Sequence, residues 1–165
     1  PGVEHACLIL QDEAGVDVCE LLFHCWLYEH GLAAEPGPLK AIREERCRWQ
    51  QQVTAPLRQL RRGLKPQAAQ SESISTLRKT LQTAEIQAER ENLQCWQQWA
   101  LLSSEQEVSV IKGSINQHNI AQWLQDTLFL LPLDNFSSQA PRVREDIQSA
   151  FLALASQLDR CESPR

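Results

Sequence analysis

Two long stretches of the chain repeat apolar side chains at the 3.6-residue period of an α-helix, and each repeat falls on a narrow stripe. The first stripe holds Leu39, Ile42, Arg46, Trp49, Val53, Leu57, Leu60 and Leu64, and the second holds Ile74, Leu77, Leu81, Ala84, Ala88, Cys95, Trp99 and Leu102. Only a polar joint, residues 66–71, separates them. The pattern therefore predicts a long antiparallel helical hairpin with arms at about 38–65 and 72–102.

Proline and serine residues mark where the arms bend and end. Pro56 lies inside the first arm and removes one backbone hydrogen bond, which predicts a kink there. Lys65 and Pro66 are expected to end that arm, and Ser71 or Ser73 is expected to cap the second arm.

Two helices are predicted before the hairpin. A short one spans Val3–Gln11 and closes near Gly15. The next spans Val16–His30 and is apolar on nearly every side, which is typical of a surrounded, central helix; Gly31 is expected to terminate it. The loop that follows delivers Pro38 to the first turn of the hairpin.

The pattern is less regular after the hairpin. Residues 103–114 fit either an extended segment or the frayed end of the long helix. A helix is predicted over 115–131, followed by a loop over 133–140 and a last helix from Pro141 to Leu158. We expect a loose polar tail over 159–165.

Size and composition favour one all-α domain covering residues 1–165, with the hairpin as its spine and with the helices over 3–30 and 115–158 packed on it. The sequence begins Pro1-Gly2 without a Met, so we expect the N-terminal helix to be truncated.

The six cysteines stand at unrelated spacings, mostly inside apolar helical runs, and are expected to be buried thiols in a reducing cytoplasm. The longest apolar stretch, Val18–Tyr28, is interrupted by Glu20 and His24 and is shorter than the roughly 20 residues that a membrane span needs. A cytoplasmic protein with no membrane association is predicted.

Charge is distributed unevenly along the chain. Residues 1–35 carry seven acids and no Lys or Arg, whereas residues 36–65 carry eight Lys and Arg against two Glu, a net charge of +6. At i, i+3, i+4 and i+7 the second segment places four cations in what we expect to be a solvent-facing strip: Arg58, Arg61, Arg62 and Lys65. Such a strip suits an acidic protein surface or RNA phosphates, or it is a solvated face neutralised by the chain's own acids. No aromatic residue interleaves it to stack on bases.

Arg46 lies on the apolar stripe, where burying a cation is costly unless a carboxylate meets it. Asp17, Asp12 and Glu20 are the candidate partners in an ion pair that docks the acidic helices on the hairpin. The alternative is a ligand pocket made by Asp12, Asp17, Trp26 and Arg46.

The sequence contains no other arrangement of residues that is typical of a catalytic, metal or cofactor site. Asp12, Glu13, Asp17 and His5 surround a glycine turn, as capping charges at a helix terminus do. The histidines have no zinc spacing, and there is neither a C-x-x-C motif nor a glycine-rich phosphate loop. We expect no catalytic residues, no metal and no cofactor. Trp96 and Trp99 are expected in the hairpin seam, or on a partner surface if the tip projects.

Two blocks of sequence resemble a family of bacterial proteins catalogued as domain of unknown function 2390. The first block holds Pro1-Gly2-Val3, Ala6-Cys7-Leu8, Leu10-Gln11-Asp12, Gly15, Asp17-Val18, Leu21-Leu22-Phe23 and Trp26, and the second holds Pro56-Leu57-Arg58, Arg61-Arg62 and Leu64-Lys65. Asn and Leu are typical of that family after Asp-Val, where this chain has Cys19 and Glu20. The resemblance covers roughly the first hundred residues and implies a compact helical bacterial protein without implying an activity.

These observations favour a non-enzymatic cytoplasmic interaction, adaptor or regulatory module that binds another macromolecule, with a protein as the expected partner. The first alternative is RNA or ribosome association through the strip at 58–65. The second is an enzyme or small-ligand binder with its pocket near Asp12, Asp17, Trp26 and Arg46.

Overall fold

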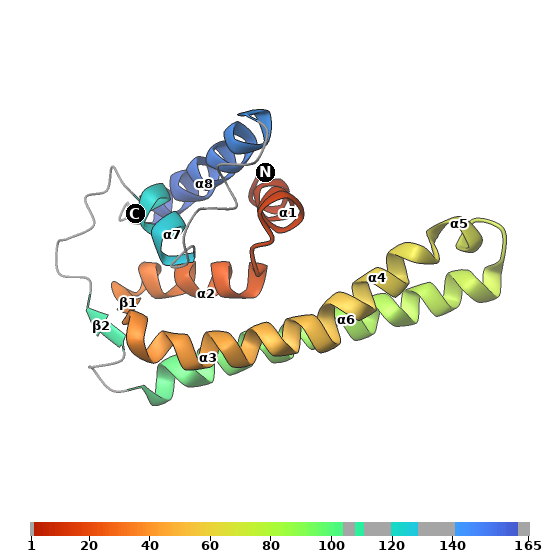
Figure 1. The fold of residues 1–165 in the computed structure, drawn as a ribbon, viewed down its shortest axis with the longest axis horizontal. Coiled ribbons are helices and arrows are strands. Elements are labelled where there is room, and N and C mark those ends of the chain that lie inside the picture. The colour runs from red at the N-terminus through yellow and green to blue at the C-terminus, as the bar shows by residue number, and fades with distance from the viewer. Residues whose placement is uncertain (1, 104–107, 111–119, 129–140, 162–165) are drawn as a thin grey trace. The chain divides into compact units, whose positions relative to one another are not determined.

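The computed structural model describes residues 2–103, 108–110, 120–128 and 141–161, and nearly all of them are helical. The all-α class is therefore confirmed. The helices are α1 (Val3–Ala14), α2 (Val18–Glu29), α3 (Pro36–Trp49), the π-helical turn η1 (Gln50–Thr54), α4 (Ala55–Gly63), α5 (Lys65–Ala68), α6 (Glu72–Leu102), α7 (Ile120–Leu128) and α8 (Pro141–Cys161), and the strands are β1 (Leu32–Ala34) and β2 (Val108–Val110) (Figure 1). No helix in these ranges is long and apolar enough to cross a membrane.

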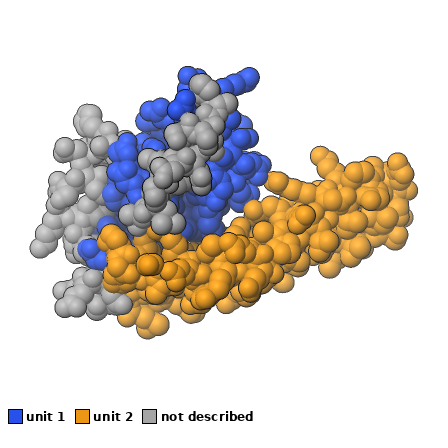
Figure 2. Space-filling view, in the orientation of Figure 1, with its two compact units in different colours: residues 1–35, 104–165 blue, residues 36–103 orange. Residues whose placement is uncertain are grey.

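The chain divides into two compact units, which Figure 2 colours separately. Unit 1 comprises residues 1–35 and 104–165, and unit 2 comprises residues 36–103. The arrangement of all helices as one domain stays a prediction, and each unit is described by itself below.

Turns in unit 1 follow the local signals in the sequence. Helix α1 ends at Gly15, whose φ of 66° is the left-handed conformation that glycine adopts without a steric penalty. Asp17 then caps α2, because its carboxylate accepts the backbone N–H of Cys19 at 2.8 Å. Gly31, with φ of 67°, follows the end of α2 as predicted.

The hydrophobic core of unit 1 joins helices from both ends of the sequence. Helix α1 contacts α8, and α7 contacts both α2 and α8. The buried core side chains include Ala6, Cys7, Leu10, Leu21, Tyr28, Ile120, Leu124, Ile147, Phe151, Leu154 and Leu158. Ile147, Phe151, Leu154 and Leu158 recur at helical spacing, so they form one buried face of α8.

A short antiparallel ladder pairs β1 with β2, with Leu32 opposite Val110 and Ala34 opposite Val108. The extended alternative for residues 103–114 is thus correct at 108–110. The helix predicted over 115–131 is observed at 120–128, and α8 continues to Cys161, so the tail is helical up to that residue. The rest of these predictions, including the loop at 133–140, lies outside the described residues.

In unit 2 the first arm, made of α3, η1 and α4, lies along α6 (Figure 1). Trp49 contacts Ala88, and further along the arm Arg58 and Arg61 contact Glu85. Because contacts that come later in the first arm come earlier in α6, the arms run antiparallel. We call the line of contact between them the seam.

The first arm differs from the prediction at its start and at its bend. Helix α3 begins at Pro36, two residues before Pro38. The departure from α-helical geometry is η1, where the N–H of Ala55 bonds to the carbonyl of Gln50 instead of Gln51. Pro56 follows at once and has no N–H to donate, so the chain accommodates one extra residue before it.

The tip of the hairpin is formed by α5 and the turn before α6. The arm continues two residues beyond its predicted end at Pro66, through the single turn α5. Ser71 occupies the cap position of α6, but its side chain bonds to the Ser73 hydroxyl at 3.0 Å and to no backbone N–H of the helix. Helix α6 has the predicted bounds.

Candidate functional site

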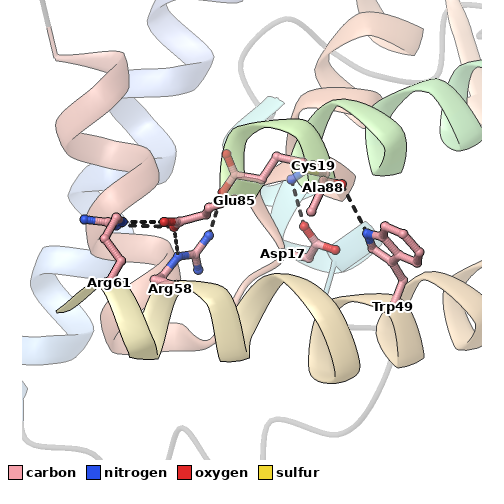
Figure 3. A network of polar contacts seen from close by, with 8 residues as sticks. Asp17, Cys19, Trp49, Arg58, Arg61, Glu85 and Ala88 are labelled. Atoms are coloured by element: carbon pink, nitrogen blue, oxygen red, sulfur yellow. Dashed lines mark hydrogen bonds and ion pairs between the residues drawn. The ribbon is translucent and has the colours of Figure 1, made fainter. Parts of the chain in front are cut away.

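Glu85 is the centre of a buried ionic network in the seam of unit 2, with only 7% of its side chain exposed. Arg58 Nε donates to Glu85 Oε1 at 2.8 Å. Arg61 donates through Nε to Oε2 and through Nη2 to Oε1, the latter at 3.2 Å (Figure 3). One carboxylate thus holds two guanidinium groups that lie one turn apart on α4.

A second carboxylate extends the network along α6. Arg58 Nη2 donates to Glu89 Oε1 at 2.7 Å. Arg58 therefore bridges Glu85 and Glu89, which are one helical turn apart, and it keeps one acidic partner if the other is removed.

The electrostatics of the network favour the charged forms of Glu85, Arg58 and Arg61. Burial alone would raise the pKa of Glu85, but the hydrogen bonds from Arg61 and Arg58 outweigh it and hold the pKa below its usual value. Burial opposes the charged form of Arg58 as well, yet its bonds to Glu85 and Glu89 raise its pKa. The bond to Glu85 raises the pKa of Arg61.

The solvent-facing strip predicted from the sequence is wrong for two of its four residues. Arg58 and Arg61 turn into the seam, because Glu85 meets them there, while Arg62 and Lys65 are exposed. Glu85 and Glu89 were not among the predicted site residues. Their i, i+4 spacing in the arm opposite four cations is the signal that points to them. The partner-binding role of Arg58, Arg61, Arg62 and Lys65 stays a prediction.

The Arg61–Glu85 contact also fixes which side chains lie on each side of the seam. Successive residues of an α-helix are rotated by 100° about its axis. Because the arms are antiparallel, the residue before Arg61 and the residue before Glu85 point to the same side of the hairpin. We call this side the apolar side: it holds Leu57, Leu60, Leu64, Leu77, Leu81 and Ala84.

Two leucines of the apolar side are exposed, Leu60 by 57% and Leu77 by 51%. Both were predicted to lie in the seam. The 100° rotation per residue from the facing pair Arg61 and Glu85 turns both leucines away from the opposite arm. Leu57, Leu64 and Leu81 are half-buried beside them.

The opposite side, which we call the charged side, carries the residues that follow the facing pair. Arg62 follows Arg61, and Ile86 follows Glu85. The same rotation along α6 places Arg78 and Lys79 on this side. Lys65, Lys79 and Arg62 are exposed, and Ile86 is 41% exposed.

Arg46 is buried in unit 2 and pairs with the carboxylate of Glu45. Its Cζ atom lies 5.9 Å from the centroid of the Trp49 ring, and Trp49 Nε1 donates to the Ala88 carbonyl at 3.1 Å. Trp49 thus links the Arg46 guanidinium to the backbone of α6.

The carboxylates expected to meet Arg46 make other contacts within unit 1. Asp17 caps α2 through Cys19, and Glu20 lies 3.6 Å from Nε2 of the buried His24. An ion pair of Arg46 with Asp17, Asp12 or Glu20 stays a prediction.

The pocket predicted at Asp12, Asp17, Trp26 and Arg46 draws on residues of both units. Asp12 is exposed, whereas Trp26 is half-buried, with its ring centroid 4.6 Å from that of His30 and 6.5 Å from that of Phe23. Three of the four residues belong to unit 1 and Arg46 belongs to unit 2. This pocket stays a prediction.

The described ranges contain no disulfide and no cluster of metal ligands. Cys7, Cys19, Cys25, Cys47 and Cys95 form no disulfide there, and no group of three or more His, Cys, Asp or Glu is placed to hold a metal ion. Burial raises the pKa of the Cys25 thiol to about 12, which makes it a poor nucleophile.

The fold and this network define an all-α protein with a charge-linked helical hairpin. The family described as "Protein of unknown function (DUF2390)" matches residues 1–95, more than half of the chain, and the protein belongs to this family. The match contains Arg58, Arg61, Glu85 and Glu89. No curated protein and no solved structure matches the chain.

Proposed function

We propose that this protein is a non-enzymatic interaction module of the bacterial cytoplasm, an adaptor or regulator that binds another protein through the hairpin of unit 2. One observation carries the proposal: Leu60 and Leu77 are each more than half exposed, and helix rotation from the Arg61–Glu85 pair turns both to the same side of the hairpin. We infer that the half-buried Leu57, Leu64 and Leu81 join them into one apolar patch, and such a patch marks a surface that a partner covers.

Energetics support a protein partner on this side. Covering the exposed part of each leucine contributes about 1 kcal/mol. The half-buried Leu57, Leu64 and Leu81 extend the apolar area along the hairpin. No Lys, Arg, Asp or Glu is among the residues of the apolar side, so a partner helix docks there without leaving a charge unpaired.

RNA or ribosome association is the weaker candidate. Arg58 and Arg61, half of the predicted strip, are neutralised by Glu85 and Glu89. Residues 55–94 also contain no Phe, Trp, Tyr or His on which a base stacks. An enzyme or small-ligand binder would need the pocket near Asp12, Asp17, Trp26 and Arg46.

The test compares three forms of the full chain as bait in lysate of the bacterium that produces it. The wild type is compared with Leu60→Ser/Leu77→Ser and with the control Leu152→Ser, which changes a leucine of α8 that is 56% exposed in unit 1. We expect the wild type and the control to retain the same partner and the double variant to lose it, with unchanged helical circular dichroism. The same partners on all three forms would contradict the proposal.

A further inference from the structure

The outer part of the hairpin, residues 55–84, has no core of its own. We call these residues the distal hairpin; they form α4, α5 and the start of α6, which lie side by side (Figure 1). The structure describes all of them, and none is buried. Stable domains enclose apolar side chains between two layers of secondary structure. The two helices of the distal hairpin make one such layer and lack the second.

The apolar side of the distal hairpin carries no charge. Rotation by 100° per residue from the Arg61–Glu85 pair places the uncharged Pro56, Ser73 and Thr80 beside its leucines. The same rotation turns every charged residue of the distal hairpin toward the seam or the charged side. These residues are Arg58, Arg61, Arg62, Lys65, Glu72, Arg78 and Lys79. The apolar side therefore offers a partner hydrophobic contact and no ionic contact.

A second copy of the chain supplies a matching face. In a twofold dimer the same surface patch meets itself, so a charge within the patch would come close to a like charge. The apolar side is free of this repulsion. Leu60 and Leu77, which are 57% and 51% exposed, gain apolar neighbours from the other copy. Two such layers packed together make a four-helix bundle, which encloses the core that the distal hairpin lacks.

We propose that the apolar side of the distal hairpin docks on the apolar side of a second copy of this chain, and that this twofold dimer covers the leucines until the partner protein displaces it. The inference rests on the proposed function, because both concern the same side of the hairpin, and it adds regulation by self-association.

The size of the face sets the expected strength of the dimer. Twelve residues of helix rise about 18 Å and two helices side by side are about 20 Å wide, so each copy contributes about 350 Å². This area is roughly half of the 800 Å² per partner that is typical of a stable complex. We therefore expect a reversible dimer with a dissociation constant on the order of 10–100 μM.

Sedimentation velocity of the full chain at increasing concentration tests the dimer. Leu60→Ser/Leu77→Ser is compared with the matched control Leu101→Ser/Leu102→Ser, which changes two leucines of α6 that are 69% and 86% exposed outside the distal hairpin. We expect the wild type and the control to dimerise equally and the first variant to dimerise at least about 10-fold more weakly. Equal losses in both variants, or a wild type that stays monomeric up to about 1 mM, would overturn the proposal.

A charge-swap pair distinguishes a lost contact from a lost fold. Leu60→Lys/Leu77→Lys and Leu60→Glu/Leu77→Glu each bring like charges into the twofold contact, so each protein alone should be monomeric. Mixed at low salt, the two should form a heterodimer about 10-fold tighter than either homodimer, and added salt should weaken it. A mixture that remains as monomeric as its components would contradict the dimer.

The lysate experiment separates this inference from the proposed function. If the wild type is monomeric but Leu60→Ser/Leu77→Ser loses a cellular partner, the dimer is wrong and the interaction module stands. If the wild type dimerises through these leucines but all baits retain the same other proteins, the second copy is the occupant of the apolar side and the proposed function fails. If the substitutions change neither the oligomeric state nor the partners, both proposals fail.

Discussion

Arg58 Nε donates to Glu85 Oε1 at 2.8 Å, and the carboxylate that accepts this bond is almost completely removed from water. A buried carboxylate is tolerated only because cations and hydrogen bonds replace its hydration. Glu85 has two such partners, while Arg58 and Arg61 are less deeply buried. Removing the acid is therefore expected to disturb the hairpin more than removing any single exposed charge.

Replacing Glu85 tests this expectation directly. Glu85→Gln keeps the shape of the side chain but leaves two guanidinium groups without their shared charge, and we expect it to lower the free energy of unfolding by about 3 kcal/mol. Urea denaturation measures the loss. Glu91→Gln, at an exposed position of the same helix, is the control and is expected to change stability by less than about 0.5 kcal/mol. Equal effects of the two variants would show that the network is not a source of stability.

The lowered pKa of Glu85 predicts how the stability of the protein changes in acid. The folded pKa of Glu85 lies below its ordinary value of 4.5, so the folded state binds this proton more weakly than the unfolded chain does. The contribution of Glu85 to the free energy of unfolding is complete above its pKa in the unfolded chain. It is lost as the pH falls through its pKa in the folded protein. Between about pH 5 and pH 2 the wild type should lose more stability than Glu85→Gln. Parallel pH profiles of the two proteins would contradict this assignment.

The four cations predicted as one strip should form two pairs that differ in their effect on stability. Arg58→Gln/Arg61→Gln leaves Glu85 buried without a cation, and we expect it to cost about 3 kcal/mol or more. Arg62→Gln/Lys65→Gln changes exposed residues and should shift stability by less than about 0.5 kcal/mol. Thermal melting of both double variants distinguishes them. A stable Arg58→Gln/Arg61→Gln protein would mean that these two side chains face water after all.

Thiol reactivity provides an independent check on burial. Cys47 is exposed and should react first with a maleimide in the folded protein, whereas the buried Cys7 and Cys19, and Cys25, whose pKa is raised to about 12 by burial, should react slowly. After unfolding without reductant, mass spectrometry should count six labels, one for each cysteine of the chain. Four labels or fewer would show disulfides and hence an oxidising compartment.

Long uninterrupted periodicity made much of the fold predictable. Helix α6 has the bounds expected from its sequence, because no proline interrupts it and polar residues flank both ends. The breaks at Gly15 and Gly31 were also predictable, since each requires a positive φ. The β1–β2 pairing was not predicted, because three-residue strands carry too little alternation to be recognised.

The candidate site was harder to predict because burial of charge depends on the partner arm. An apolar stripe places Leu60 and Leu77 in the seam, but it does not show that Glu85 enters the seam and draws in Arg58 and Arg61. Periodicity describes one helix at a time. The rotation of each arm was decided by a contact between residues 24 positions apart.

The π-helical turn η1 gives the first arm a local tolerance to changes in length. A π-turn holds one residue more than an α-helical turn, so deleting Gln52 would convert η1 to regular α-helix while keeping the contacts of Trp49 with Ala88 and of Arg61 with Glu85. Deleting one residue of α6 between Glu85 and Ala88 would instead rotate half of that helix by 100° and separate the two contacts. Along this hairpin, insertions and deletions of a single residue should therefore accumulate in homologous proteins at 50–54 and be rare in the middle of α6.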